Sequence, residues 1–160
     1  MVLEESEPPP STEPSIQERL YPDLTCFGCG QANPQGLRLR SYPDADGVVA
    51  RFAAWPEHDN GMGFVNGGIL ATVLDCHSGA AVFHRSAEQG SPPGTGAPLV
   101  YVTAGLDVRY LRPAPLGETL LLRATVTSAT VDEVVVEAEA TRDGKARATA
   151  TSLWKAWRPR

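Results

Sequence analysis

Apolar residues recur at helical spacing along one continuous stretch of this chain. The positions that set the spacing are Ile69, Leu70, Val73, Leu74, Ala80, Ala81 and Phe83. The pattern runs over more than ten residues and includes alanine, a strong helix former, so it predicts a helix and not a strand. Asn66 is a favourable N-cap residue, and we place the helix at about 66–84. Because the segment is apolar nearly all round, we expect the helix to be buried.

Alternating patterns typical of strands lie on both sides of the predicted helix. Residues 37–40 alternate with period two, and an apolar run at 48–52 follows a turn at 44–47, which predicts a hairpin. After a glycine- and proline-rich loop at 86–97, strand-like runs follow at 98–111, 118–129, 131–141 and 145–157. We therefore expect an α+β fold, in which a curved antiparallel sheet of about five to six strands wraps one long central helix. The sheet would cover most sides of the helix, and a second copy of the chain could cover the rest.

Length and composition fit a single domain preceded by a polar tail. The chain has 160 residues, and residues 1–17 are acidic and rich in proline, which predicts a disordered or loosely docked N-terminal tail. Residues 18–160 would then form the one folded domain. The net charge of −5 does not favour nucleic acid as a partner. The longest apolar run is interrupted by Asp75 and His77, so we expect no membrane span, and the N-terminus lacks the apolar core of a secretory signal, so we expect a cytoplasmic protein.

Asp75 is a carboxylate in the middle of the apolar helix. A buried Asp costs several kcal/mol unless it is paired or hydrogen-bonded, so its presence needs a reason. One interpretation is structural, with Asp75 closing a turn or pairing with an arginine such as Arg109. The other is a general base or nucleophile, because buried surroundings raise the pKa of a carboxyl group toward the range where a base is useful.

A glycine pair, Gly67 and Gly68, opens the predicted helix. Free N–H groups at a helix start, together with the positive end of the helix dipole, form an anion site with no side chain in the way. The Gly67 N–H is therefore a candidate oxyanion donor, although the pair could instead serve close packing of helix on sheet. Gly67 and Asp75 are eight residues apart, about 12 Å along a helix. One carbonyl cannot touch both within one chain, so a site that uses both must combine two protomers.

Two of the three cysteines, Cys26 and Cys29, form a CxxC motif. Structural zinc usually has four ligands, and the remaining cysteine, Cys76, lies within the predicted helix. No βαβ pattern follows the motif, which disfavours a thioredoxin-like role. We therefore expect reduced thiols in a buried turn or a partner contact, and no metal site.

Arg109 and Arg112 flank Tyr110 near the end of a predicted strand. They are either simple surface charges or ligands for the phosphates of a nucleotide-bearing substrate. The sequence has no GxSxG motif, so serine-hydrolase chemistry is not indicated.

Several of these residues fall in motifs that resemble a known family. The motifs are Asn60, Asn66-Gly67-Gly68-Ile69-Leu70-Ala71-Thr72-Val73-Leu74-Asp75, Tyr110-Leu111-Arg112-Pro113-Ala114 with Gly117, and the N-terminal Cys26-Phe27-Gly28-Cys29-Gly30 with Asn33-Pro34-Gln35-Gly36-Leu37. They resemble the hotdog-fold acyl-CoA thioesterases of the phenylacetate-degradation (PaaI-like) type, over roughly residues 25–157. The resemblance implies a long helix wrapped by an antiparallel sheet, paired into a homodimer and often into a dimer of dimers, a homotetramer.

By position, the resemblance implies roles for four residues. Asp75 matches the catalytic carboxylate, and Gly67 matches the residue whose N–H polarises the thioester carbonyl. Asn60 matches a polar residue that helps to hold the thioester or the attacking water, and Thr103 matches a hydroxyl residue that orients this water. In such enzymes the Asn and Gly come from one protomer and the acid and hydroxyl from the other, as the spacing between Gly67 and Asp75 also requires.

Asn66 departs from the family pattern, which usually has His at this position. Asn caps a helix start as well as His does, so we expect activity to survive, with Asn66 and Gly68 beside the bound substrate. The expected function is hydrolysis of an acyl-CoA or similar thioester to free acid and thiol, with no cofactor except the coenzyme A of the substrate. Two alternatives remain, an acyl-CoA hydratase or dehydratase of the same fold and a non-catalytic acyl-CoA-binding module. The first usually carries a catalytic His in or before the helix, which Asn66 replaces here.

Overall fold

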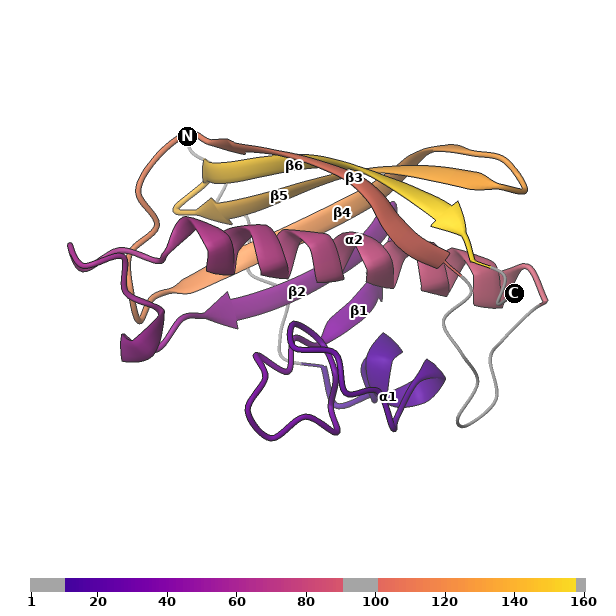
Figure 1. Cartoon of the computed structure of the whole chain (residues 1–160), viewed down its shortest axis with the longest axis horizontal. Helices are drawn as coiled ribbons and strands as arrows, with labels where there is room; N and C mark the ends of the chain where they lie inside the picture. Colours follow the sequence, from indigo (N-terminus) through magenta and orange to yellow (C-terminus); the bar gives the residue numbers. More distant parts are fainter. Residues whose placement is uncertain (1–10, 91–100, 158–160) are drawn as a thin grey trace.

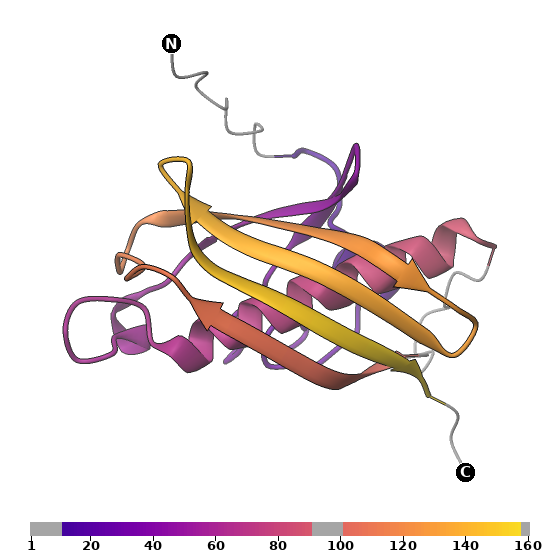
Figure 2. The same cartoon turned by 90° about the horizontal axis from the view of Figure 1, so that it is seen from above.

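One long helix packs against a curved antiparallel sheet in the computed structural model, which describes residues 11–90 and 101–157 (Figure 1). The helix α2 is Gly67–Glu88. The strands are β1 (Ser41–Asp44), β2 (Gly47–Ala53), β3 (Tyr101–Tyr110), β4 (Thr119–Ala129), β5 (Glu133–Arg142) and β6 (Lys145–Ala156). They form one sheet in the order β1-β2-β4-β5-β6-β3, with every pairing antiparallel. Figure 2 shows the sheet lying across α2 along most of its length.

The prediction of a central helix and strands on both sides is confirmed. Asn66 is the N-cap of α2, and the helix continues to Glu88, past the predicted end at about 84. Its buried positions face small side chains of the sheet, so the helix axis can lie close to β5 and β6. These small buried residues are Ala138, Ala140, Ala148 and Ala150. Most of the predicted 86–97 loop, and the first residues of the predicted 98–111 strand, lie outside the described residues.

The first predicted strand, at 37–40, is wrong: the hairpin is formed by β1 and β2 around a turn at 45–46. The alternation at 37–40 is real, because Leu37 and Leu39 are both buried. However, their N–H groups donate to Phe27 O (2.7 Å) and Gly28 O (3.0 Å) of the preceding loop and not to a strand. Arg38 between them has a φ of 52°, a left-handed conformation that a regular strand does not contain.

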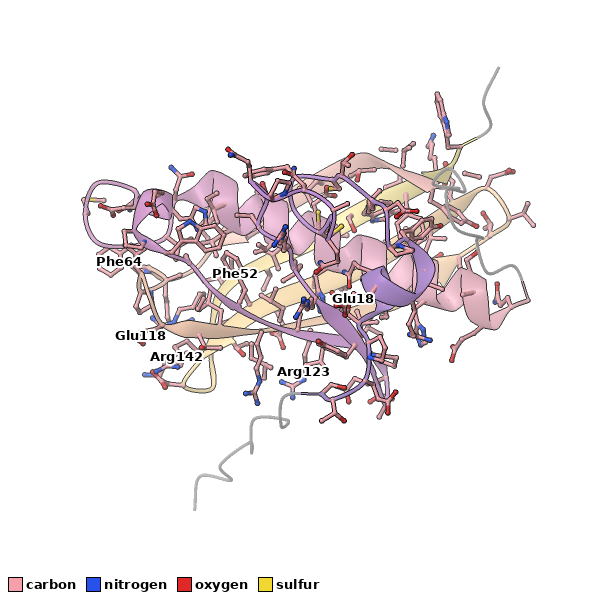
Figure 3. The ribbon with its side chains drawn as sticks, turned by 90° about the horizontal axis from the view of Figure 1, so that it is seen from below. Glu18, Phe52, Phe64, Glu118, Arg123 and Arg142 are labelled. Atoms are coloured by element: carbon pink, nitrogen blue, oxygen red, sulfur yellow. The ribbon has the colours of Figure 1, made fainter. Side chains whose placement is uncertain are left out.

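Residues 15–17, which the sequence analysis placed in the N-terminal tail, are packed into the domain. A short helix, α1 (Ile16–Leu20), begins with a capping box in which Ser15 N donates to Glu18 Oε2 (2.8 Å) and Glu18 N donates to Ser15 Oγ (3.2 Å). Ser15, Ile16 and Gln17 are all buried, so the packed domain starts earlier than residue 18. Figure 3 shows α1 and the loop that follows it lying across the side of α2 that the sheet leaves open. The chain itself therefore supplies part of the cover that the sequence analysis assigned to a second copy.

A buried polar network links this N-terminal segment to α2 and the sheet. The Ser41 hydroxyl and His77 Nδ1 are 2.9 Å apart, and His77 Nε2 lies 3.2 Å from Val48 O. Because a carbonyl oxygen only accepts, Nε2 carries the proton and Nδ1 accepts from Ser41. Gln17 completes the network, since its Nε2 donates to Ser41 Oγ (3.2 Å) and its Oε1 accepts from Ser41 N (2.9 Å). Complete burial lowers the pKa of His77 to about 4, so the ring is neutral.

The two edges of the sheet differ in a way that bears on assembly. The edge strand β1 has four residues and contains Pro43, features that discourage pairing with another chain. The opposite edge strand, β3, has ten residues, and its exposed side chains include the apolar Val102, Leu106 and Tyr110. A long edge strand with exposed apolar side chains is a template for pairing with another strand. Among the described residues, no helix is both long and apolar enough to cross a membrane.

Candidate active site

The start of α2 is shaped by its cap. Asn66 Oδ1 accepts a hydrogen bond from Gly68 N (2.8 Å), and Asn66 O accepts from Ile69 N (3.0 Å). Gly67 is the first residue of α2, so the helix cannot supply an acceptor for the Gly67 N–H. The predicted capping role of Asn66 is confirmed. Its side chain and the Gly68 N–H are both engaged in the cap, so their predicted contacts with a substrate stay a prediction.

The loop that leads into α2 is ordered by its own polar side chains. Asn60 Oδ1 accepts from Met62 N (2.9 Å) and Phe64 N (3.4 Å), and Asp59 Oδ1 accepts from Gly63 N (2.8 Å). Gly61 and Gly63 have φ values of 89° and 83°, which glycine adopts without strain. The loop therefore holds Asn60 close to the start of α2. Its role in binding a thioester stays a prediction.

The turn after β3 fixes the helix start from the other side. Tyr110 Oη donates to Gly67 O (2.8 Å), and a Cβ on Gly67 would lie 3.3 Å from the Tyr110 ring. Val65 N donates to Ala114 O (2.9 Å), and Phe64 forms a bridge with Pro115. Figure 3 shows Phe64 at this end of the molecule. The Tyr-Leu-Arg-Pro-Ala motif thus braces the glycine-opened helix start, a contact that the sequence analysis missed because nothing local to Tyr110 predicts its partner.

Asp75 lies two turns further along α2, where β3 passes the helix. The Thr103 hydroxyl donates to Asp75 Oδ1 at 2.8 Å. The structural alternative, an ion pair with Arg109, is not what the structure shows: Arg109 lies 3.7 Å from Asp107 on the exposed side of β3. Two residues that the resemblance placed on one catalytic side, Asp75 and Thr103, are therefore in direct contact.

A cavity of about 220 Å³ opens beside Asp75 and Thr103. Its walls are mainly aromatic and small, and they include Tyr21, Phe83, Tyr101, Trp154, Gly79 and Ala80. Phe83 makes edge-to-face contacts with Tyr21 (ring centroids 5.1 Å apart) and Trp154 (6.1 Å), which fix the shape of one wall. Trp154 also packs on Gly79 so closely that a Cβ there would lie 2.8 Å from its ring. An apolar cavity with one carboxylate at its rim suits an uncharged group next to a site of acid–base chemistry.

Burial is the main cause that raises the pKa of Asp75 above the usual range of an aspartic acid. The hydrogen bond from Thr103 opposes this shift, and the nearby Cys26 thiol, where it is ionised, adds to it. A raised pKa makes the ionised carboxylate a stronger base than an exposed one.

The two arginines are placed differently. Arg112 Nη1 donates to Ala146 O (2.8 Å), which ties the turn after β3 to β6. The Arg109 side chain is 73% exposed and lies beside Asp107. Neither finding tests the predicted contact with substrate phosphates, which stays a prediction.

Cys26, Cys29 and Cys76 come together, which their positions in the sequence did not reveal. Their sulfur atoms all lie within 4.8 Å of one another, and we name these three residues the thiol cluster. Hydrogen bonds from the Cys29 and Cys76 thiols, followed by the N–H groups of Cys29 and Gly28, lower the pKa of the Cys26 thiol. The thiol cluster lines the same cavity as Asp75.

The candidate residues thus form two groups along α2. Asn60, Asn66 and Gly67 gather at the helix start, while Asp75 and Thr103 meet near its middle. Eight residues of helix separate Gly67 from Asp75, about 12 Å of rise. Within one chain, a single carbonyl group cannot contact both groups.

Comparisons with known proteins give the family. Residues 62–149, more than half of the chain, match the thioesterase superfamily, and the chain belongs to this family. Acyl-coenzyme A thioesterase 13 of Homo sapiens is 30% identical over 79 residues, which are 49% of this chain and 49% of that protein. The chain therefore spans about half the length of the curated relatives that it matches.

Solved structures support the same conclusion about the fold. The phenylacetic acid degradation-related protein of Ralstonia eutropha JMP134 is 27% identical, with a TM-score of 0.63 over 75% of this chain and 86% of that one. A protein of Bacillus halodurans solved with CoA is 26% identical, with a TM-score of 0.57 over 68% of this chain and 66% of that one. The fold is the hotdog fold, and the resemblance to thioesterases of the phenylacetate-degradation type is confirmed.

Proposed function

We propose that this protein hydrolyses an acyl-CoA or a closely related thioester to a free acid and a thiol, with Asp75 as the base or nucleophile. The observation that carries the proposal is the 2.8 Å hydrogen bond from Thr103 to Asp75 at the rim of an apolar cavity. Family membership supports the reaction class, and a relative of the same fold was solved with CoA. Hydrolysis needs no cofactor beyond the coenzyme A of the substrate.

The chemistry follows from the groups at the cavity rim. In the base route, Asp75 takes a proton from water while the water oxygen bonds to the thioester carbon. The carbonyl oxygen then carries negative charge, which a preorganised N–H donor such as that of Gly67 would stabilise. When the C–S bond breaks, the thiolate leaves and the proton held by Asp75 can return to it. In the nucleophile route, Asp75 itself bonds to the carbon and the C–S bond breaks, which releases the thiolate and leaves a mixed anhydride. Water later cleaves this anhydride to give the free acid and to restore the Asp75 carboxylate.

Thr103 fits a supporting role in either route. Its hydroxyl donates a hydrogen bond to Asp75 Oδ1, so the Thr103 oxygen can still accept a hydrogen bond from the attacking water. A side chain held in this way orients both the carboxylate and the water, which lowers the entropic cost of the attack.

The oxyanion donor would come from a second copy of the chain. Gly67 and Asp75 of one chain are too far apart for one thioester, as the rise of α2 shows. The long, partly apolar edge of β3 supplies a surface on which two copies can pair. A homodimer, or a dimer of such dimers, would then place Gly67 of one protomer opposite Asp75 and Thr103 of the other, and Arg109 and Arg112 near the rim for the CoA phosphates.

The direct test compares two aspartate variants in a thiol-release assay across short, long and aromatic acyl-CoAs. Asp75→Asn removes the carboxylate charge with little change in size, and we expect it to lower kcat/KM by about 10²–10⁴-fold. Asp46→Asn is the matched control, because Asp46 is an exposed carboxylate in the turn between β1 and β2. We expect the control to keep near wild-type turnover. Equal turnover in Asp75→Asn and the wild type would remove Asp75 from the mechanism.

A further inference from the structure

The thiol cluster has no part in the proposed thioester chemistry, yet its three sulfur atoms converge from two distant parts of the chain. Cys26 and Cys29 lie in the loop after α1, and Cys76 lies in α2. The sulfur atoms of Cys26 and Cys76 are 3.8 Å apart. Zn–S bonds of about 2.3 Å at tetrahedral angles would hold two sulfur ligands about 3.8 Å from each other. We propose that the thiol cluster binds one Zn²⁺ ion through its three thiolates.

The loop that carries two of the ligands is held in place by backbone hydrogen bonds. Gly30 N donates to Cys26 O (2.8 Å), which closes the CxxC turn. Outside the turn, the chain at 37–39 donates to Phe27 O and Gly28 O, so both residues between the two cysteines are fixed through their carbonyl groups. The two sulfur atoms are therefore presented by a preorganised turn, which keeps the entropic cost of binding an ion low.

Two glycines allow the turn to reach the third cysteine. A Cβ on Gly28 would collide with Cys76 Sγ, and a Cβ on Gly30 would collide with Cys26 N and Leu24 O. The loop backbone thus lies directly on α2 at Cys76. Packing alone explains a close approach of loop and helix, but it does not explain why three thiol side chains meet at this contact.

The cavity leaves room for a fourth ligand on the ion. The cavity of about 220 Å³ is lined by all three cysteines, so an ion held there faces the cavity. Three protein ligands with an open fourth position for water or an added ligand are a common zinc arrangement. The sequence predicts no metal site only when all four zinc ligands must come from the protein. The set is soft, with three thiolates, which favours Zn²⁺ over Mg²⁺ or Ca²⁺.

A bound ion would connect the N-terminal segment to the central helix. The loop after α1 covers the side of α2 that the sheet leaves open, as Figure 3 shows, and it forms one wall of the cavity. Zn–S bonds from Cys26 and Cys29 to an ion also held by Cys76 would fix that wall. Zinc should therefore raise the melting temperature and protect the thiols from alkylation.

The experiment uses the full chain, purified with a non-thiol reductant and stripped of metal. Zn²⁺ is titrated against a chromophoric chelator, and Co²⁺ is added separately to look for sulfur-to-metal charge-transfer bands. We expect one ion per chain, the charge-transfer bands, and at least about a tenfold loss of affinity in Cys26→Ser and Cys76→Ser. His84→Gln is the matched control, because His84 and Glu88 lie 3.5 Å apart and could bind zinc adventitiously at the surface.

The controls separate the thiol cluster from every other source of binding. Charge-transfer bands in the wild type and in His84→Gln, absent from the cysteine variants, would support the proposal. Should a cysteine variant fail to fold, zinc-dependent protection of the wild-type thiols from alkylation decides the question. Zinc affinity lost in His84→Gln but kept in Cys76→Ser, or wild-type Co²⁺ spectra without sulfur bands, would overturn it. These readouts do not involve thioester turnover, so they stand whether or not the proposed function holds.

Discussion

At the scale of single residues, the proposed role of the Gly67 N–H as oxyanion donor can be tested by substitution. Proline is well tolerated at the first position of a helix, where it lacks only an N–H that the helix does not use. Asn66 has φ −56° and ψ 136°, a conformation that the residue before a proline favours. Gly67→Pro should therefore keep α2 while removing the proposed oxyanion donor.

The expected result for Gly67→Pro is a fall in kcat of about 10²–10³-fold with the fold intact. Gly67→Ala is its control, because it adds the same Cβ against the Tyr110 ring but keeps the N–H. Steady-state thiol release and circular dichroism of both variants make the comparison. If Gly67→Ala loses as much activity as Gly67→Pro, crowding at Tyr110 is responsible and not the missing N–H.

Thr103 offers a second test at this scale. Thr103→Val removes the hydroxyl that donates to Asp75 and keeps the β-branched shape that suits β3. We expect kcat/KM to fall by about 10–100-fold, while Thr103→Ser keeps most activity, because both the hydrogen bond and the orientation of water depend on the hydroxyl. A comparison of kcat/KM for the two variants checks this. Activity kept in Thr103→Val but lost in Thr103→Ser would mean that the methyl group, and not the hydroxyl, matters.

The sequence predicted single residues well where the signal was local. Asn66 was identified as the cap from its residue type and place, and this is confirmed. Asp75 was singled out by the conflict between its charge and its apolar helix, and its catalytic role stays a prediction. The partners of these residues were not predictable from local pattern, because Tyr110 reaches Gly67 across 43 positions and Cys26 reaches Cys76 across 50. Thr103 could be matched to Asp75 only through the family resemblance.

Helices and strands were predictable from the sequence where the spacing of apolar residues matches the buried face of the element. The helix and the strands β4, β5 and β6 have faces buried against one another, so their periodicity shows in the sequence. The segment 37–40 alternates in the same way, but its backbone bonds to the 27–28 carbonyls, which periodicity does not record. The local hydrophobic pattern therefore predicts which side chains point inward, but it does not predict which backbone groups form hydrogen bonds with each other.

The buried network around His77 makes a prediction about how α1, β1 and α2 hold together. The pKa of His77 is about 4 in the folded protein and about 6.5 when unfolded, so folding favours the neutral ring. This contribution is complete above about pH 6.5 and is lost as the pH falls from 6.5 toward 4, by up to about 3 kcal/mol. Chemical unfolding at several pH values should show this loss in the wild type and a flatter dependence in His77→Gln. The same pH dependence of the unfolding free energy in both proteins would contradict the lowered pKa of His77.

At the scale of the whole molecule, the account depends on two copies of the chain. The acid and hydroxyl lie mid-helix, the candidate amide lies two turns earlier, and the long edge of β3 is open for a second chain. Neither group alone forms a site for a thioester. Assembly of two chains would bring the groups together and would also cover the exposed apolar side chains of β3.

The measurement that tests this most directly is complementation between two inactive variants. Asp75→Asn and Gly67→Pro are each prepared, mixed, dissociated and reassembled, and thiol release is compared with that of each variant treated alone. In a mixed dimer, one of the two shared sites has both Asp75 and the Gly67 N–H intact, so mixing should restore a substantial part of the wild-type activity. If the mixture stays as inactive as its components although mixed dimers have formed, the site does not combine Asp75 of one chain with Gly67 of another.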